Sequence, residues 1–193
     1  EAEGTACASG SYELALVKKR CKIQALRDAV PPDFPGNWGI GHTRWATHGG
    51  VNDQNAHPHL DGSGRIAVVH NGIIENYRAL KDMLEAEGVV FLSDTDSEVI
   101  PHLIAKYYEG DLEAAVKAAI AHLQGTYGIA VIHADEPGII VGARNGSPLV
   151  IGVGEGEMLL ASDITAMMAH TRQVVYLNDG EVVRISAQGF RTT

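Results

Sequence analysis

Short apolar runs and polar clusters alternate through the first half of the chain. Residues 14–17, 38–42 and 66–69 are apolar stretches of strand length, and the last is rich in β-branched side chains, which predicts a buried strand. Residues 1–11 are small and polar, which predicts a loop or a frayed end. The pattern therefore predicts strands that lie far apart in the sequence.

Helical signals follow in the middle of the chain. Residues 23–30 form a short candidate helix, and apolar side chains recur at helical spacing over 73–84. Thr95 and Glu98 have the spacing of a capping box, which predicts a further helix start. Asp111 is the expected N-cap of the next helix.

The pattern changes after Gly128, where short strands separated by turns dominate. They are predicted at residues 129–133, 138–142, 149–153, 158–161, 174–177 and 181–185. The sequence 178–180 (Asn-Asp-Gly) is a hairpin signal between the last two. Consecutive strands with short turns favour antiparallel sheet, and helices grouped in the middle favour an α+β fold of one domain, residues 1–193.

Composition narrows the class of protein. The chain has 193 residues, 45% of them hydrophobic, and a net charge of −9, which argues against nucleic acid as a partner. No apolar run approaches the roughly 20 residues that cross a bilayer, and the first residues do not resemble a signal peptide. Cys7 and Cys21 form no metal-binding spacing, so a cytoplasmic protein with two free thiols is expected.

Three polar clusters, residues 42–49, 70–76 and 93–98, are the candidates for chemistry. They follow or precede the predicted elements, where binding residues are often found. Together they supply a cation, an amide donor and carboxylates. This set suits the recognition of a small zwitterion.

Within these clusters Arg44 is the candidate for a substrate carboxylate, because its planar fork can grip both oxygens. The alternative is a surface ion pair, worth about 0–1 kcal/mol. Asn71 and Gly72 could form an oxyanion hole from a side-chain amide and a backbone N–H. The dipeptide alone favours an ordinary turn, but the helix expected directly after it argues against a hairpin.

Asp96 is the candidate for a substrate ammonium, since the capping box would occupy its neighbours. His57 and His59 lack a third metal ligand nearby, so hydrogen-bonding roles are expected and no metal is predicted. The remaining candidate histidines are expected in helices or strands without polar company: His102, His122, His133 and His170.

Five motifs occur in an order that resembles a known family. They are HTRWATHG (42–49), NAHPH (55–59), HNGIIEN (70–76), SDTDSEV (93–99) and NGSPLVIG (145–152). The chain resembles the glutaminase domains of glucosamine-6-phosphate synthases, which are class II, N-terminal-nucleophile amidotransferases. The resemblance implies a four-layer αββα sandwich with two antiparallel sheets, which lacks its opening strand here.

The resemblance also implies an activity. L-Glutamine would be hydrolysed to glutamate and ammonia without a cofactor, and the ammonia would pass to fructose 6-phosphate on an isomerase domain absent from this chain. Arg44 would hold the α-carboxylate and Asp96 the α-ammonium of glutamine, and Asn71 and Gly72 would form the oxyanion hole. The pocket would be completed by Trp45, Thr47 and His48. The full-length enzyme would be a homodimer.

The family's nucleophile is an N-terminal cysteine, whereas residue 1 here is Glu. Neither Cys7 nor Cys21 lies in the motif of that cysteine, so the nucleophile is expected upstream of Glu1, in an N-terminally incomplete domain. Two other hypotheses remain open. The chain could be a non-catalytic glutamine-binding module, or the glutaminase domain of another class II amidotransferase.

Overall fold

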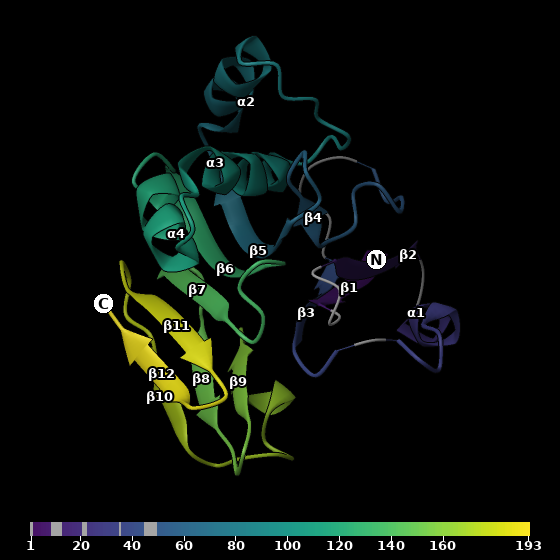
Figure 1. Ribbon diagram of the computed structural model, residues 1–193, viewed down its shortest axis with the longest axis vertical. Coiled ribbons are helices and arrows are strands. Elements are labelled where there is room, and N and C mark those ends of the chain that lie inside the picture. Colours follow the sequence, from purple (N-terminus) through teal and green to yellow (C-terminus); the bar gives the residue numbers. More distant parts are fainter. Residues whose placement is uncertain (1, 9–12, 21–22, 35, 45–49) are drawn as a thin grey trace.

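The computed structural model describes residues 2–8, 13–20, 23–34, 36–44 and 50–193. Its centre is a sheet of six antiparallel strands in the order β12–β11–β7–β6–β5–β4 (Figure 1). Their bounds are β4 His59–Leu60, β5 Ile66–Ile74, β6 Gly125–His133, β7 Ile140–Asn145, β11 Val182–Ser186 and β12 Gly189–Thr192. The longest pair is β5 with β6, in which nine residues of each strand pair one for one.

Three helices cover one face of this sheet (Figure 1). They are α2 (Tyr77–Ala86), α3 (Val99–Tyr107) and α4 (Leu112–Ile120). Ile66 and Val68 of β5 join Leu103 and Val116 from the helices in the largest hydrophobic core. Asp111 caps α4 as expected, because its carboxylate accepts a hydrogen bond of 3.0 Å from the Ala114 N–H.

Two three-stranded antiparallel sheets lie on the opposite face. One has the order β2–β1–β3, with bounds Leu14–Arg20, Ala2–Ala8 and Gly39–Arg44, and the other has the order β10–β8–β9, with bounds Val174–Tyr176, Val150–Val153 and Met158–Ala161. Successive side chains of a strand point to opposite faces. Ala67 of β5 therefore points away from the helices and packs with Ile40 of β3, and Val183 of β11 packs in the same way with Ile151 of β8.

The layers agree with the predicted αββα sandwich. Helices α2 to α4, the central sheet and the two small sheets follow one another, and α1 (Ile23–Ala29) lies outside β2 (Figure 1). The second β-layer differs in one respect from the prediction. Among the described residues it consists of two separately hydrogen-bonded sheets instead of one.

Two local predictions were wrong. The backbone of Ala2–Ala8 forms β1, the middle strand of its sheet, although its small polar residues predicted a loop. Pairing with β2 on one edge and β3 on the other outweighs this weak local preference. The turn at Asn178–Gly180 also does not close a hairpin, because β10 pairs with β8 while β11 pairs with β7 and β12.

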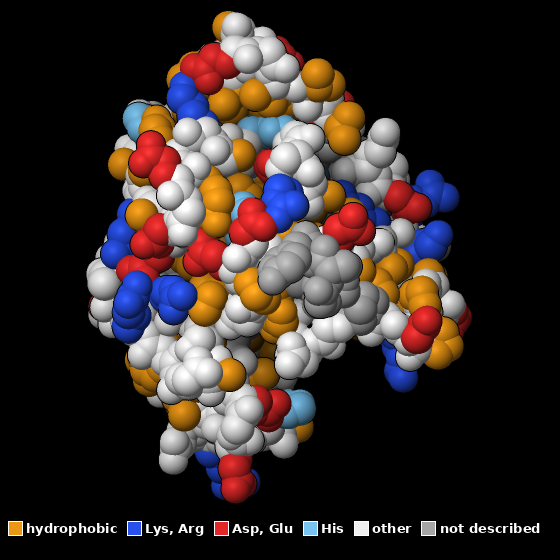
Figure 2. All heavy atoms as spheres, viewed as in Figure 1, with side chains coloured by type: hydrophobic (Ala, Val, Ile, Leu, Met, Phe, Trp, Pro, Cys, Tyr) orange, Lys and Arg blue, Asp and Glu red, His pale blue; other side chains and the backbone are white. Residues whose placement is uncertain are grey.

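Charged side chains of both signs are intermixed over the face of the molecule shown in Figure 2. The net charge of −9 is therefore accompanied by no large basic area on that face. In the part of the chain that the structure describes, no helix has the length and apolar character needed to span a bilayer.

Candidate functional site

Residues from four separate segments line a cavity of about 150 Å³, and three of these segments carry predicted site residues. Arg44 comes from the end of β3, Asn71 and Gly72 come from β5, and Asp96 opens the 3-10 helix η1 (Asp96–Glu98). The fold thus brings together the cation, the amide and the carboxylate that the sequence holds in three clusters. The other predicted site residues lie outside the described residues: Trp45, Thr47 and His48.

Asn71 and Gly72 lie inside a strand. β5 continues to Ile74 and α2 begins only at Tyr77, so the prediction of a helix from residue 73 was wrong, and the alternative of an ordinary turn is excluded as well. Gly72 has φ of +129°, and a Cβ there would lie 2.1 Å from the Thr126 carbonyl oxygen on β6. Only glycine fits this contact between the two strands.

Asp96 is buried, and one of its oxygens is used by the fold. The Ile74 N–H donates a hydrogen bond of 2.8 Å to Asp96 Oδ2, which ties η1 to the end of β5. The expectation that the Asp96 side chain takes part in no structural hydrogen bond was therefore wrong. The same bond fixes the orientation of the carboxylate at the cavity wall.

The predicted capping box does not form. Thr95 makes no side-chain capping bond, and Thr95 Oγ1 lies 3.1 Å from His59 Nε2. Glu98 instead accepts hydrogen bonds from the Leu92 and Ser93 N–H groups at 2.7 and 2.6 Å. Burial alone would raise the pKa of Glu98, but the nearby His102 ring and hydrogen bonds from Leu92 and Ser93 lower it to about 2. Glu98 thus holds the segment before η1 in place as an anion.

Arg44 is buried, with 3% of its surface exposed. Its Nη1 donates a hydrogen bond of 3.0 Å to the Gly50 carbonyl oxygen. Burial lowers the pKa of Arg44, and the negative charge of Asp96 opposes that shift. A buried guanidinium near a buried carboxylate is not the exposed ion pair considered as the alternative, and both groups border the same cavity.

Three histidines line this cavity, the half-buried His42 and the buried His57 and His70, and the buried His59 packs beside His57. No local sequence pattern predicts this grouping. The rings of His42 and His57 have centroids 4.2 Å apart, and those of His57 and His59 are 4.7 Å apart. His70 Nδ1 lies 2.8 Å from Ser97 Oγ. Burial lowers the pKa of all four, that of His59 to about 3. They are therefore neutral at pH 7, and the hydrogen-bonding role expected for His57 and His59 agrees with their contacts.

The other histidines were expected to lack polar company, and that prediction was wrong. His122 Nε2 lies 2.8 Å from Tyr107 Oη, and His133 Nδ1 accepts a hydrogen bond from the Asp135 N–H. His102 and His170 lie 3.6 and 3.2 Å from glutamate oxygens. No group of three or more metal-ligating side chains occurs among the residues that the structure describes.

Comparison with known protein families shows the family to which this chain belongs. Residues 42–169 match the glutamine amidotransferase domain family. This chain belongs to that family. The match includes Arg44, Asn71, Gly72 and Asp96, which line the cavity.

Individual relatives within this family are more informative about the kind of amidotransferase. Over 153 residues the chain is 61% identical to the glutamine–fructose-6-phosphate aminotransferase (isomerizing) of Methanothermobacter thermautotrophicus, covering 78% of the chain and 26% of that protein. It is 46% identical over 202 residues to the enzyme of the same name from Mycolicibacterium paratuberculosis, covering 100% of the chain and 32% of that protein. The chain thus spans less than a third of the length of these relatives.

A solved structure supports the fold. Glutamine phosphoribosylpyrophosphate amidotransferase from B. subtilis is 26% identical, with a TM-score of 0.82, and the similarity covers 100% of this chain and 42% of that one. The chain is therefore a glutamine amidotransferase domain homologous to the glutaminase region of glutamine–fructose-6-phosphate aminotransferases.

Proposed function

We propose that the cavity binds L-glutamine and that this domain hydrolyses it to glutamate and ammonia, as the glutaminase half of a glutamine–fructose-6-phosphate aminotransferase. The observation that carries the proposal is the meeting of Arg44, Asn71, Gly72 and Asp96 around one small cavity. Opposite charges and an amide donor around this cavity match the charged and polar groups of free glutamine.

Each residue has a role in this proposal. Arg44 binds the α-carboxylate with its planar fork, and Asp96 accepts hydrogen bonds from the α-ammonium. The Asn71 amide and the Gly72 N–H stabilise the negative oxygen of the tetrahedral intermediate. The pocket is completed by residues outside the described part: Trp45, Thr47 and His48.

The proposed nucleophile is the thiol of a cysteine upstream of Glu1 in the full-length protein. Its sulfur attacks the carboxamide carbon, and its proton passes through the terminal amine to the departing ammonia as the C–N bond breaks. Water then cleaves the thioester, which releases glutamate and restores the thiol. Neither Cys7 nor Cys21 has this role in the proposal.

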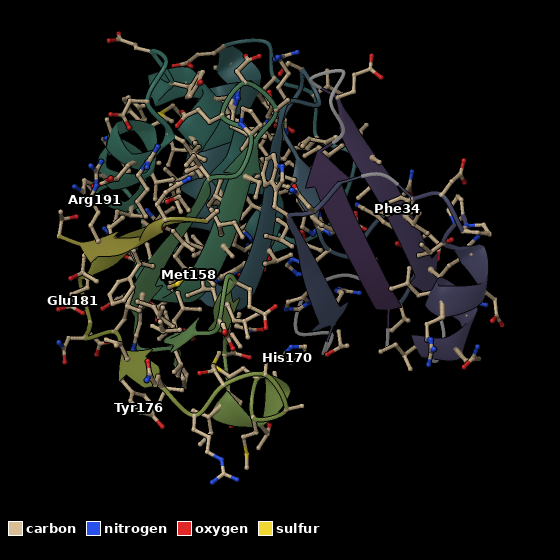
Figure 3. The ribbon with its side chains drawn as sticks, turned by 60° about the horizontal axis from the view of Figure 1, so that its bottom comes forward. Phe34, Met158, His170, Tyr176, Glu181 and Arg191 are labelled. Atoms are coloured by element: carbon tan, nitrogen blue, oxygen red, sulfur yellow. The ribbon has the colours of Figure 1, made fainter. Side chains whose placement is uncertain are left out.

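A groove beside the cavity suits the strand that would carry this cysteine. The groove has a volume of about 550 Å³ and is lined by residues 39–43 of β3 and 158–161 of β9, on the two small sheets seen in Figures 1 and 3. Consecutive residues on both sides mean that strand edges border it. His42 and Asn71 line both the groove and the cavity. One extended strand here would join the two small sheets and lead to the oxyanion hole.

The proposal extends to the acceptor and the assembly. Ammonia would pass to fructose 6-phosphate on an isomerase domain of the same cytoplasmic polypeptide, which would act as a homodimer. No cofactor takes part in the glutaminase step as proposed. The names of the curated relatives support the acceptor, since they are glutamine–fructose-6-phosphate aminotransferases.

Glutamine hydrolysis by the full-length protein tests the proposal. Replacing Arg44 with Lys keeps a charge but removes the fork, and should raise the KM for glutamine about 10- to 100-fold with little change in kcat. The control is Arg65→Lys, because Arg65 is exposed and pairs only with Asp135 among the contacts that the structure describes. This control should leave both constants unchanged.

Two results would count against the proposal. An unchanged KM in Arg44→Lys would show that Arg44 does not bind the α-carboxylate of glutamine. Glutamine binding by the full-length protein without hydrolysis would favour a binding module in place of a glutaminase.

A further inference from the structure

His42 reaches Asn71 across two layers of the sandwich. His42 lies on β3 of a small sheet and Asn71 lies on β5 of the central sheet. Their side chains nevertheless meet, with His42 Nε2 2.8 Å from Asn71 Oδ1. This is the distance of a good hydrogen bond. The side-chain amide is therefore held from the sheet opposite to its own.

The direction of this hydrogen bond sets the direction of the amide. Asn71 Oδ1 can only accept, so His42 Nε2 carries the hydrogen and donates it. The oxygen and the NH2 group of an amide point to different sides. Tethering the oxygen to His42 therefore turns the NH2 donors of Asn71 elsewhere, and Asn71 also lines the cavity of Arg44 and Asp96. A reversed amide would present an oxygen to a developing oxyanion, which it would repel.

Contacts with neighbouring side chains hold the His42 ring in its orientation toward Asn71. The His57 ring packs against it at an interplanar angle of 37°, with centroids 4.2 Å apart, and His57 Nδ1 accepts a hydrogen bond of 3.3 Å from the His70 N–H. Burial keeps the ring neutral, because it lowers the pKa of His42 even though the hydrogen bond to Asn71 opposes that shift. A neutral ring has one N–H, and the Asn71 oxygen fixes it on Nε2.

We propose that His42 is a positioning residue, which orients the Asn71 amide so that its NH2 group, and not its oxygen, serves the oxyanion hole. This inference rests on the proposed glutaminase function. His42 also lines the cavity, but in this proposal it acts through Asn71. Its effect therefore belongs to the chemical step and not to substrate binding.

Two substitutions of His42 separate the hydrogen bond from the bulk of the ring. The side-chain nitrogen of glutamine can reach about the place of imidazole Nε2, whereas that of asparagine lies near the place of Nδ1. In the full-length protein, His42→Asn should lower the kcat of glutamine hydrolysis about 10- to 100-fold and change the KM less than about 3-fold. His42→Gln should keep kcat within about 3-fold. Rates are expressed per site that binds glutamate in calorimetry, which removes misfolded protein from the comparison.

A double-mutant cycle then tests whether His42 acts through Asn71. Asn71→Ala alone should lower kcat about 10²- to 10³-fold. Adding His42→Asn to it should cost less than about 3-fold more, because the amide to be oriented is already gone.

The outcomes separate this inference from the proposed function. Any of three results would overturn the role of His42 while leaving the glutaminase proposal intact. The kcat losses of the two single variants could multiply in the double mutant, His42→Asn and His42→Gln could lower kcat equally, or only the KM could change. A normal kcat in Asn71→Ala would instead overturn the oxyanion hole itself, and the role of His42 with it.

Discussion

Gly72 meets two requirements at one residue. Its φ of +129° disfavours any residue with a side chain, and its Cα faces the Thr126 carbonyl oxygen closely enough that a Cβ would lie 2.1 Å away. We expect Gly72→Ala to lower the free energy of unfolding of the chain by about 1–2 kcal/mol for the backbone and a further 1–3 kcal/mol for the clash. Urea denaturation of the purified domain measures the sum.

Gly189 offers a matched control. Its φ is +132°, and a Cβ there would have nothing within 4 Å. Gly189→Ala should therefore show only the backbone cost, and the difference between the two variants isolates the contact with Thr126. Equal losses at both positions would mean that β5 and β6 separate easily at Gly72, and that the close approach is not needed for the fold.

The residue types of the site could be predicted from the sequence, but their surroundings could not. Arg44, Asn71 and Asp96 attract attention because a fork, an amide and a carboxylate stand in polar clusters. Asp96 was nevertheless expected to be spared by capping, and it accepts from Ile74 instead. The role of His42 has no local signal, because its partner Asn71 lies 29 residues away on another sheet. Local patterns do not contain such contacts.

At the scale of elements, errors arose where a partner decides between strand and helix. Ile73 and Ile74 fit the apolar face of a helix, yet β5 keeps them because its pairing with β6 extends to Ile74 opposite Gly125. β1 is a strand for the same reason, with pairing partners on both edges. Elements with strong internal signals were predicted well, such as α4 with its Asp111 cap.

Glu98 connects two elements, and its removal should loosen both. Its carboxylate accepts three hydrogen bonds from Leu92 and Ser93, so it fastens the segment after α2 to the start of α3. Glu98→Gln places an NH2 group against these donors. We expect a loss of about 2–3 kcal/mol in the free energy of unfolding. Thermal and urea denaturation at pH 7 provide the measurement.

An exposed glutamate nearby serves as the comparison. Glu87 forms a surface ion pair with Lys106, and such pairs are worth about 0–1 kcal/mol. Glu87→Gln should therefore hardly change the stability. The assignment of Glu98 as the group that joins these elements would be refuted by similar, small effects of both substitutions.

For the whole molecule, the α+β class and the sandwich could be anticipated, because strand and helix patterns separate along the chain. The convergence of three clusters on one cavity could not, since it depends on how three sheets stack. The burial of His57, His59 and His70, beside the half-buried His42, is also a property of the whole fold. This burial makes the stability of the whole domain depend on pH.

The domain should lose stability as the pH falls below about 6.5. Burial lowers the pKa of the folded-state imidazoles of His42, His57, His59 and His70, whereas the unfolded chain has ordinary values near 6.5. Between these values the unfolded state binds more protons, so stability rises with pH and is lost on acidification. Each histidine contributes up to about 1.4 kcal/mol per pH unit, from about 6.5 down to its folded pKa.

Melting temperatures between pH 7.5 and 5 should therefore fall steadily, and this range isolates the histidines. Glu98 has a folded pKa of about 2 and an ordinary unfolded value near 4.5, so its stabilising contribution is lost only at lower pH. His59→Gln can keep a hydrogen bond to Thr95 and removes a group whose folded pKa is about 3. Its pH dependence should be shallower than that of the unchanged chain, because one of the histidines with a lowered pKa is gone, while others such as His42, His57, His70 and His133 remain. A slope that His59→Gln leaves unaltered would mean that this imidazole becomes protonated without cost, through an opening of the layers that exposes it to water.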